Sequence, residues 1–115
     1  MRLDPISILV VDDNRSVLDA LVLLLEREGY RVTGCSDGQS AIDRIASERF
    51  DLVLTDLRME PVDGMQVVRA ARGASPPIET MVFTAYGSVE AAVEAMRLAS
   101  HKLSVKTKFV ARRAQ

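Results

Sequence analysis

The feature that most constrains this chain is a short, largely aliphatic run, Leu52-Val53-Leu54-Thr55, that ends in the carboxylate of Asp56. Charged residues flank the run, with Asp51 before it and Arg58 soon after it. Such a run is typical of a central strand of a parallel sheet, buried on both faces. Open α/β sheets bind their ligands at the carboxyl ends of strands, where Asp56 falls. A solvated aspartate at a strand end fits this run equally well.

A second stretch of the same kind occurs near the start of the chain, Ile8-Leu9-Val10-Val11 followed by Asp12 and Asp13. Further strands are predicted at 30–35 and 78–83, and helical periodicity follows the successive strands near 15–28, 41–46, 65–71 and 89–96. This alternation predicts βαβ units and a parallel sheet covered by helices on both faces. A short fifth strand is expected at 103–105, and a short fifth helix is expected to start at Phe109.

Length and composition indicate one ordinary globular domain of 115 residues. The net charge of −1 indicates no nucleic-acid partner, although all sixteen acidic residues precede residue 97, where nine basic residues leave a balance of −7. Six basic residues and no acidic one follow. The single cysteine, Cys35, excludes an internal disulfide and favours a buried, inert thiol. Without a signal peptide or an 18-residue apolar run, the expected compartment is the cytoplasm, with no membrane partner.

Three carboxylates are expected at one edge of the sheet, because Asp12, Asp13 and Asp56 all follow strands that should be neighbours. At an effective dielectric constant of ~20, two such charges ~4 Å apart repel by about 4 kcal/mol. Raised pKa values or a cation must relieve this repulsion. Oxygen-only ligands favour a hard ion, above all Mg²⁺, whose open positions could hold a phosphoryl group. Thr84, at the end of the fourth strand, and Lys106, after the fifth, could donate to that group.

These residues resemble the receiver domain of two-component response regulators over nearly the whole chain. The resemblance is carried by Asp12-Asp13 after the first strand, Asp56 after the third, Met59, Asp63-Gly64 and Thr84-Ala85. The segment from Thr84 to Met96 is similar to receivers of the NtrC type. The resemblance implies a flavodoxin-like (CheY-like), doubly wound parallel sheet of five strands in the order 2-1-3-4-5.

The resemblance also implies a role for each residue of the site. Asp56 would accept a phosphoryl group from a sensor histidine kinase. Mg²⁺ would be bound by Asp13, by the Asp56 carboxylate and by the backbone carbonyl of Arg58, with Asp12 supporting the site. Thr84 would bond the phosphoryl oxygen, and Lys106, 22 residues later, would pair with the phosphoryl group.

The chain departs from the family pattern mainly in its last part. Glu60 stands where the family usually has Pro, and Leu103 stands where it usually has an aromatic switch residue. We therefore expect one receiver domain over 1–115 with an atypical segment at 99–115. Signalling would pass through the surface of the fourth helix, fifth strand and fifth helix to an effector domain or a second copy of the chain.

Three other functions can be compared with this one. A phosphorylation-silent module could use the same fold to bind a protein partner. An FMN-binding flavodoxin is disfavoured, because the loop after the first strand is acidic and lacks a phosphate-binding cradle. A phosphatase with an aspartate nucleophile would need a second acid two residues after Asp56, where Arg58 stands. We therefore expect no enzyme beyond the phosphorylation and dephosphorylation of the domain itself.

Overall fold

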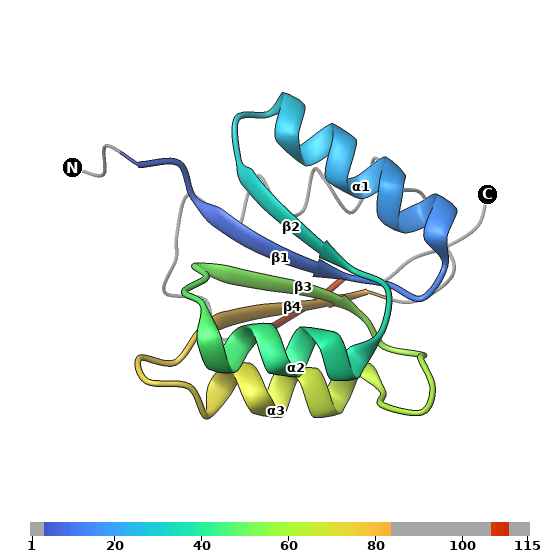
Figure 1. The fold of residues 1–115 in the computed structure, drawn as a ribbon, viewed down its shortest axis with the longest axis vertical. Coiled ribbons are helices and arrows are strands. Elements are labelled where there is room, and N and C mark those ends of the chain that lie inside the picture. The colour runs from blue at the N-terminus through green and yellow to red at the C-terminus, as the bar shows by residue number, and fades with distance from the viewer. Residues whose placement is uncertain (1–3, 84–106, 111–115) are drawn as a thin grey trace.

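Five parallel strands form a single sheet with helices on both faces, as the sequence predicts (Figure 1). The computed structural model describes residues 4–83 and 107–110. The order of the strands is β2-β1-β3-β4-β5. Helix α1 covers one face, and α2 and α3 lie side by side on the other. The strands are β1 Ser7–Val11, β2 Arg31–Cys35, β3 Leu52–Asp56, β4 Glu79–Phe83 and β5 Thr107–Val110, and the helices are α1 Arg15–Arg27, α2 Gly38–Ser47 and α3 Gly64–Arg72.

Strand β3 is the centre of the core, and all five of its residues are buried. Alternate side chains of the sheet point to opposite faces and join two apolar clusters. Leu54 lies in the cluster that packs beneath Leu21 and Leu25 of α1. Val53 lies in the cluster that packs beneath α2 and α3. The largely apolar sequence of this strand therefore has the predicted cause, which is burial on both faces.

The helix ends follow local signals in the sequence. Asn14 is the N-cap of α1, and its side chain accepts a hydrogen bond from the N–H of Val17 (3.2 Å). Gly29 ends that helix with a φ of 100°, a left-handed conformation that favours glycine. Asp63 and Gln66 form a reciprocal capping box at the start of α3. These caps fix where the strand-to-helix loops begin and end.

The pairing register places the carboxyl ends of β1 and β3 at one edge of the sheet. Val11 pairs with Thr55, and Asp56 pairs with Phe83 of β4. The edge position of β2, which the more polar sequence of that strand predicts, is confirmed. Asp12 and Asp56 therefore stand level with each other, one residue beyond the Val11–Thr55 pair.

The position of the fifth strand corrects the sequence prediction. Phe109 and Val110 were expected to begin a helix, but they belong to β5, where Val110 pairs with Phe83. Two physical reasons favour the strand. β-Branched and aromatic residues suit a strand, and a helix with only six residues after Phe109 would be marginally stable. The expected strand at 103–105 and the expected helix at 89–96 lie outside the described residues.

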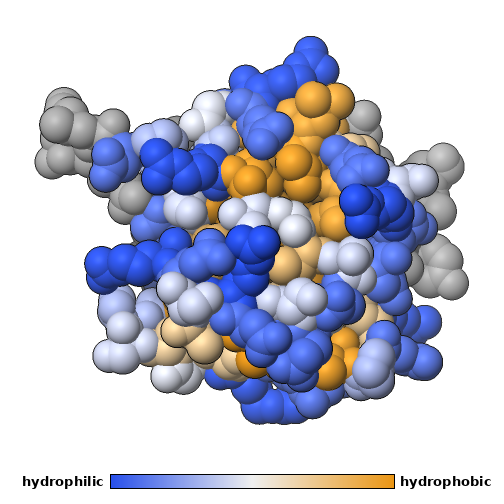
Figure 2. Space-filling view, viewed as in Figure 1, coloured by the Kyte–Doolittle hydropathy of each residue, from blue (hydrophilic) through white to orange (hydrophobic). Residues whose placement is uncertain are grey.

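The face of the molecule seen in Figure 2 is largely hydrophilic, with apolar area gathered beside α1 and β2. The side chain of Leu23 on α1 is the most exposed large apolar one among the described residues, at 56%. None of the described helices combines the length and the apolar character that crossing a membrane requires.

Truncation of Leu54 tests the importance of the central strand. Leu54 is fully buried, so Leu54→Ala should lower the free energy of unfolding by about 2–5 kcal/mol in urea denaturation. The matched variant Leu23→Ala removes the same atoms from an exposed site and should cost less than about 1 kcal/mol. Equal losses in the two variants would contradict this account of the core.

Candidate functional site

Three carboxylates meet at the carboxyl edge of the sheet. Asp12 and Asp13 follow β1, and Asp56 is the last residue of β3. One carboxylate oxygen from each residue lies within 4.8 Å of those of the other two. Asp12 and Asp56 are only 3% and 4% exposed, whereas Asp13 is exposed. The cluster that the sequence predicts is therefore present, with two buried members and one that faces solvent.

Backbone N–H groups orient the two buried carboxylates. The N–H of Asn14 donates to Oδ1 of Asp12 at 2.8 Å. The N–H of Arg58 donates to Oδ1 of Asp56 at 3.3 Å. The hydroxyl of Thr55, itself fully buried, donates to the backbone carbonyl of Asp56 at 3.0 Å. The first two bonds hold the acidic side chains in place, and the third fixes the backbone at the end of β3.

Burial and mutual repulsion raise the pKa values of both buried acids. Burial raises the pKa of Asp12 to about 6, against the hydrogen bond from Asn14, and the charges of Asp56 and Asp13 add to the rise. The pKa of Asp56 is raised mainly by burial, is lowered in part by the N–H of Arg58, and is raised further by the charge of Asp13. Keeping these two carboxylates ionised in the folded protein therefore costs free energy.

The loop between β3 and α3, residues 57–63, forms one wall of the site. The N–H of Leu57 donates to the carbonyl oxygen of Phe83 (2.9 Å), and the N–H of Gly64 donates to the carbonyl oxygen of Leu57 (3.0 Å). A Cβ at Gly64 would collide with the carbonyl oxygen of Asp56, so this position has no room for a side chain. Met59, at 5% exposure, anchors the loop in the core beneath α2 and α3.

Two motif residues of this loop, Met59 and Gly64, have packing roles beyond their place in the sequence motif. The structure gives Met59 the role of an apolar anchor and Gly64 the role of a close backbone contact with the acidic strand end. An apolar residue within a charged loop, followed by Asp-Gly, is the signal that could have indicated both roles.

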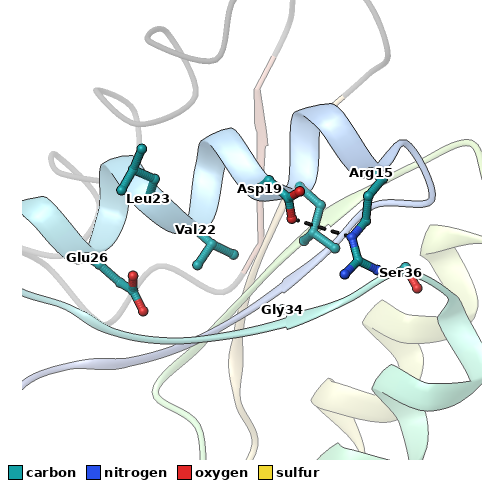
Figure 3. A pocket seen from close by; sticks show the side chains of 8 residues that line it. Arg15, Asp19, Val22, Leu23, Glu26, Gly34 and Ser36 are labelled. Atoms are coloured by element: carbon teal, nitrogen blue, oxygen red, sulfur yellow. Dashed lines mark ion pairs between the residues drawn. The ribbon is translucent and has the colours of Figure 1, made fainter.

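A separate shallow hollow lies between α1 and β2 (Figure 3). Gly34 on the edge strand leaves room there for Val22 and Leu18, whose side chains would stand 3.1 and 3.3 Å from a Cβ at that position. An ion pair between Arg15 and Asp19 (3.5 Å) crosses one end of it. None of the three clustered carboxylates lines this hollow. The acidic edge and this hollow are therefore separate sites on the protein.

Two of the predicted site residues cannot be placed. Thr84 and Lys106 lie outside the described residues, and their roles stay predictions. Lys106 immediately precedes β5, whose first residue, Thr107, pairs with Thr80. The expectation that a strand ends just before this lysine therefore has no support from the described strand. The metal-ligating role of the Arg58 carbonyl also stays a prediction.

The donor set of the acidic edge suits a hard divalent cation. Among the described residues it consists of carboxylate oxygens from three side chains, with no nitrogen or sulfur ligand. Mg²⁺ prefers oxygen ligands and is commonly bound through one or two carboxylates and several waters. Two buried acids with raised pKa values and one exposed acid fit that requirement, because a cation would offset their repulsion.

The fold and the acidic edge together define a doubly wound α/β domain of the receiver type. The family model described as response regulator receiver domain matches residues 8–108. The chain is 41% identical over 97 residues to the transcriptional regulatory protein ZraR of Escherichia coli K12, covering 84% of this chain and 22% of that protein. The chain thus spans about a fifth of the length of this curated relative.

Solved structures show the same fold. A CheY-like receiver domain from Methanospirillum hungatei superposes with a TM-score of 0.73 at 24% identity, covering 97% of this chain and 85% of the other. The response regulator TrrA of Thermotoga maritima, solved in complex with Mg(2+)-BeF, gives a TM-score of 0.70 at 26% identity, covering 93% and 86%. The chain belongs to the response regulator receiver domain family. Domains of this family are phosphoacceptor switches of two-component systems, so the predicted class of function is confirmed.

The raised pKa of Asp12 predicts how the stability of the metal-free protein depends on pH. Between the ordinary value of 3.8 and the folded value of about 6, the folded state binds more protons than the unfolded chain. The contribution of Asp12 to stability is therefore greatest at low pH and is lost as pH rises through about 6, by roughly 3 kcal/mol. Asp12→Asn removes this charge and keeps an oxygen that can accept from Asn14.

Chemical denaturation without divalent cations checks this prediction. Asp12→Asn should be more stable than the original protein at pH 7.5, and the difference should shrink towards zero at pH 4. A matched substitution of an exposed acid on α2, Asp43→Asn, should show no such gain at pH 7.5. A stability difference for Asp12→Asn that is independent of pH would contradict the assignment of a buried, charged carboxylate.

Proposed function

We propose that Asp56 is the phosphoacceptor of this receiver and that a sensor histidine kinase is the phosphoryl donor. In this proposal Mg²⁺ is bound by Asp12, Asp13, the carboxylate of Asp56 and the backbone carbonyl of Arg58. The observation that carries the proposal is the convergence of three carboxylates within 4.8 Å, two of them buried with raised pKa values. A structural strand end does not require such a costly arrangement, whereas a cation-dependent phosphoryl site does.

Among the three carboxylates, the family resemblance assigns the role of nucleophile to Asp56. Asp56 ends the central strand β3, and the N–H of Arg58 holds one of its oxygens. A carboxylate oxygen of Asp56 would attack the phosphorus of a phosphohistidine. The phosphorus–nitrogen bond breaks, its electron pair stays with the imidazole, and an acyl phosphate forms on Asp56. Bound Mg²⁺ would neutralise charge on the phosphoryl oxygens during this transfer.

The remaining members of the proposed site would contact the phosphoryl group during the transfer and in the phosphorylated domain. Phosphorylation adds roughly −1.5 to −2 charges at neutral pH. The hydroxyl of Thr84 would donate to a phosphoryl oxygen, and the ammonium group of Lys106 would pair with the added charge. A shift of the domain from 1:99 to 99:1 between two states requires about 5.5 kcal/mol of differential stabilisation. The proposed output surface is that of the fourth helix, fifth strand and fifth helix.

The partners of this domain are proposed from its relatives. ZraR is named a transcriptional regulatory protein, and this chain matches about a fifth of it. We propose that this domain likewise controls transcription in the cytoplasm, through an effector domain or a homodimer and without contacting nucleic acid itself. No chemistry beyond its own phosphorylation and dephosphorylation is proposed for it.

Phosphorylation by a small-molecule donor tests the proposed acceptor. Incubation with acetyl phosphate and Mg²⁺ should produce a slower band on a phosphate-affinity gel, because Asp56 gains a phosphoryl group. Asp56→Asn should abolish the slower band, since an amide cannot form the acyl phosphate. Chelation of Mg²⁺ should also abolish it.

An exposed aspartate supplies the matched control for this experiment. Asp43→Asn on α2 should leave the slower band intact. A band that persists in Asp56→Asn would assign the acceptor elsewhere. The absence of any band in the original protein would favour the phosphorylation-silent module.

Two nearby lysines separate a functional cation from a general charge effect. Lys106→Ala should slow phosphorylation by acetyl phosphate at least about tenfold, because a positive donor to the phosphoryl group is lost. Lys108→Ala removes the same charge from within β5, where its backbone pairs with Met81, and should leave the rate unchanged. Equal rates for both variants and the original protein would show that Lys106 matches the family spacing only by chance.

A further inference from the structure

The first residue of α2 touches the loop that borders the acidic site. Gly38 is buried, and a Cβ at this position would lie 2.6 Å from the carbonyl oxygen of Val62 and 2.7 Å from its Cγ1. Both distances are too short for real contacts, and one of them involves backbone. The backbones of α2 and of the loop 57–63 therefore approach so closely that only a hydrogen atom fits between them.

The need for glycine at this position is one of space and not of backbone conformation. Among the described residues, Gly29 is the glycine with a positive φ, so Gly38 has a conformation open to other residues. Alanine has a higher helix propensity than glycine, by about 1 kcal/mol in a helix interior. Alanine at this position would not weaken α2. Any loss of stability or of Mg²⁺ binding must therefore arise from the contact with Val62.

The helix side of this contact is firmly held. Asp37 caps α2, and its Oδ1 accepts from the N–H of Ser40 at 2.7 Å. The hydroxyl of Ser40 donates to the other oxygen, Oδ2, at 3.0 Å. An added methyl group on Gly38 would therefore displace the loop more readily than the capped turn.

The loop side leads directly to the acidic site. Val62 lies between Met59, which is anchored in the core, and Asp63, which caps α3. The same loop begins at Leu57 and Arg58, whose N–H holds the carboxylate of Asp56. Asp63 is fixed at the start of α3, so a displacement at Val62 would be passed back along the loop, through Met59, to Arg58, the proposed carbonyl ligand of Mg²⁺.

We propose that Gly38 is a positioning residue for the acidic site, which sets the loop 57–63 at the distance that Mg²⁺ binding and phosphorylation require. Gly38 acts through its contact with Val62 and touches neither the carboxylates nor the phosphoryl group. This inference rests on the proposed function of Asp56. It adds that the N-terminus of α2 and the site are mechanically coupled.

Gly38→Ala tests the proposal through Mg²⁺ affinity. The dissociation constant is obtained from the rise of Tm with Mg²⁺ concentration, since a ligand that binds only the folded state raises Tm. It should increase by about tenfold, at the low end of the range for groups that support metal ligands. The rate of phosphorylation by acetyl phosphate at subsaturating Mg²⁺ should fall in proportion and should recover at saturating Mg²⁺.

Gly73→Ala is the matched control. It adds the same methyl group at the C-cap of α3, where the new Cβ would be 3.3 Å from the carbonyl oxygen of Arg69. Its Mg²⁺ dissociation constant should equal that of the original protein. A purely structural role for Gly38 would lower Tm without Mg²⁺ and leave the dissociation constant unchanged, which would overturn the proposal.

A second variant approaches the contact from the loop. If Gly38→Ala does not fold, Val62→Ala removes the Cγ1 atom that faces Gly38 and should weaken Mg²⁺ binding a few-fold by loosening the loop. Unchanged affinity in that variant would also overturn the inference. If the original protein neither binds Mg²⁺ nor becomes phosphorylated, the proposed function fails first, so the two failures are distinguishable.

Discussion

The crowding of three carboxylates, two of them buried, is the constraint on which the rest of this site depends. The register of the parallel sheet makes it unavoidable, because Val11 pairs with Thr55 and so brings Asp12 level with Asp56. Backbone N–H groups orient the two buried acids but do not cancel their charge, and the pKa of each remains raised. Holding these charged carboxylates together therefore costs free energy, which a bound divalent cation would lower. For this reason the domain should bind Mg²⁺ and, through the metal, a phosphoryl group.

The core is arranged so that this costly edge can be held in place. Strand β3 is buried on both faces and delivers Asp56 at its end, and the loop that follows is anchored by an apolar side chain, Met59. Two glycines then allow backbone to approach backbone: Gly64 beneath the carbonyl of Asp56 and Gly38 against Val62. Neither contact involves charge. Both set the distance between the acidic strand end and the loop that carries Arg58, so packing and electrostatics act at the same few residues.

Much of this arrangement could be predicted from the sequence, because the signals are local and strong. Strand β3 and its carboxylate follow from an apolar run bounded by charge, and the cap at Asn14 and the left-handed Gly29 follow from single residues. The prediction of a helix at Phe109 and Val110 is wrong, because these two residues give no periodicity long enough to distinguish a strand from a helix, and pairing with β4 makes them part of a strand. The role of Gly38 could not be predicted at all, since it depends on a contact with a residue 24 positions away that has no local signature.

Amide NMR during a Mg²⁺ titration at pH 7.5 tests whether the three carboxylates form one Mg²⁺ site. One shared site should produce saturable shifts concentrated at the amides of Asp13, Asp56 and Arg58, and a much weaker response at the same amides in Asp13→Asn. Shifts that are absent, that do not saturate, or that are identical in Asp13→Asn would contradict it.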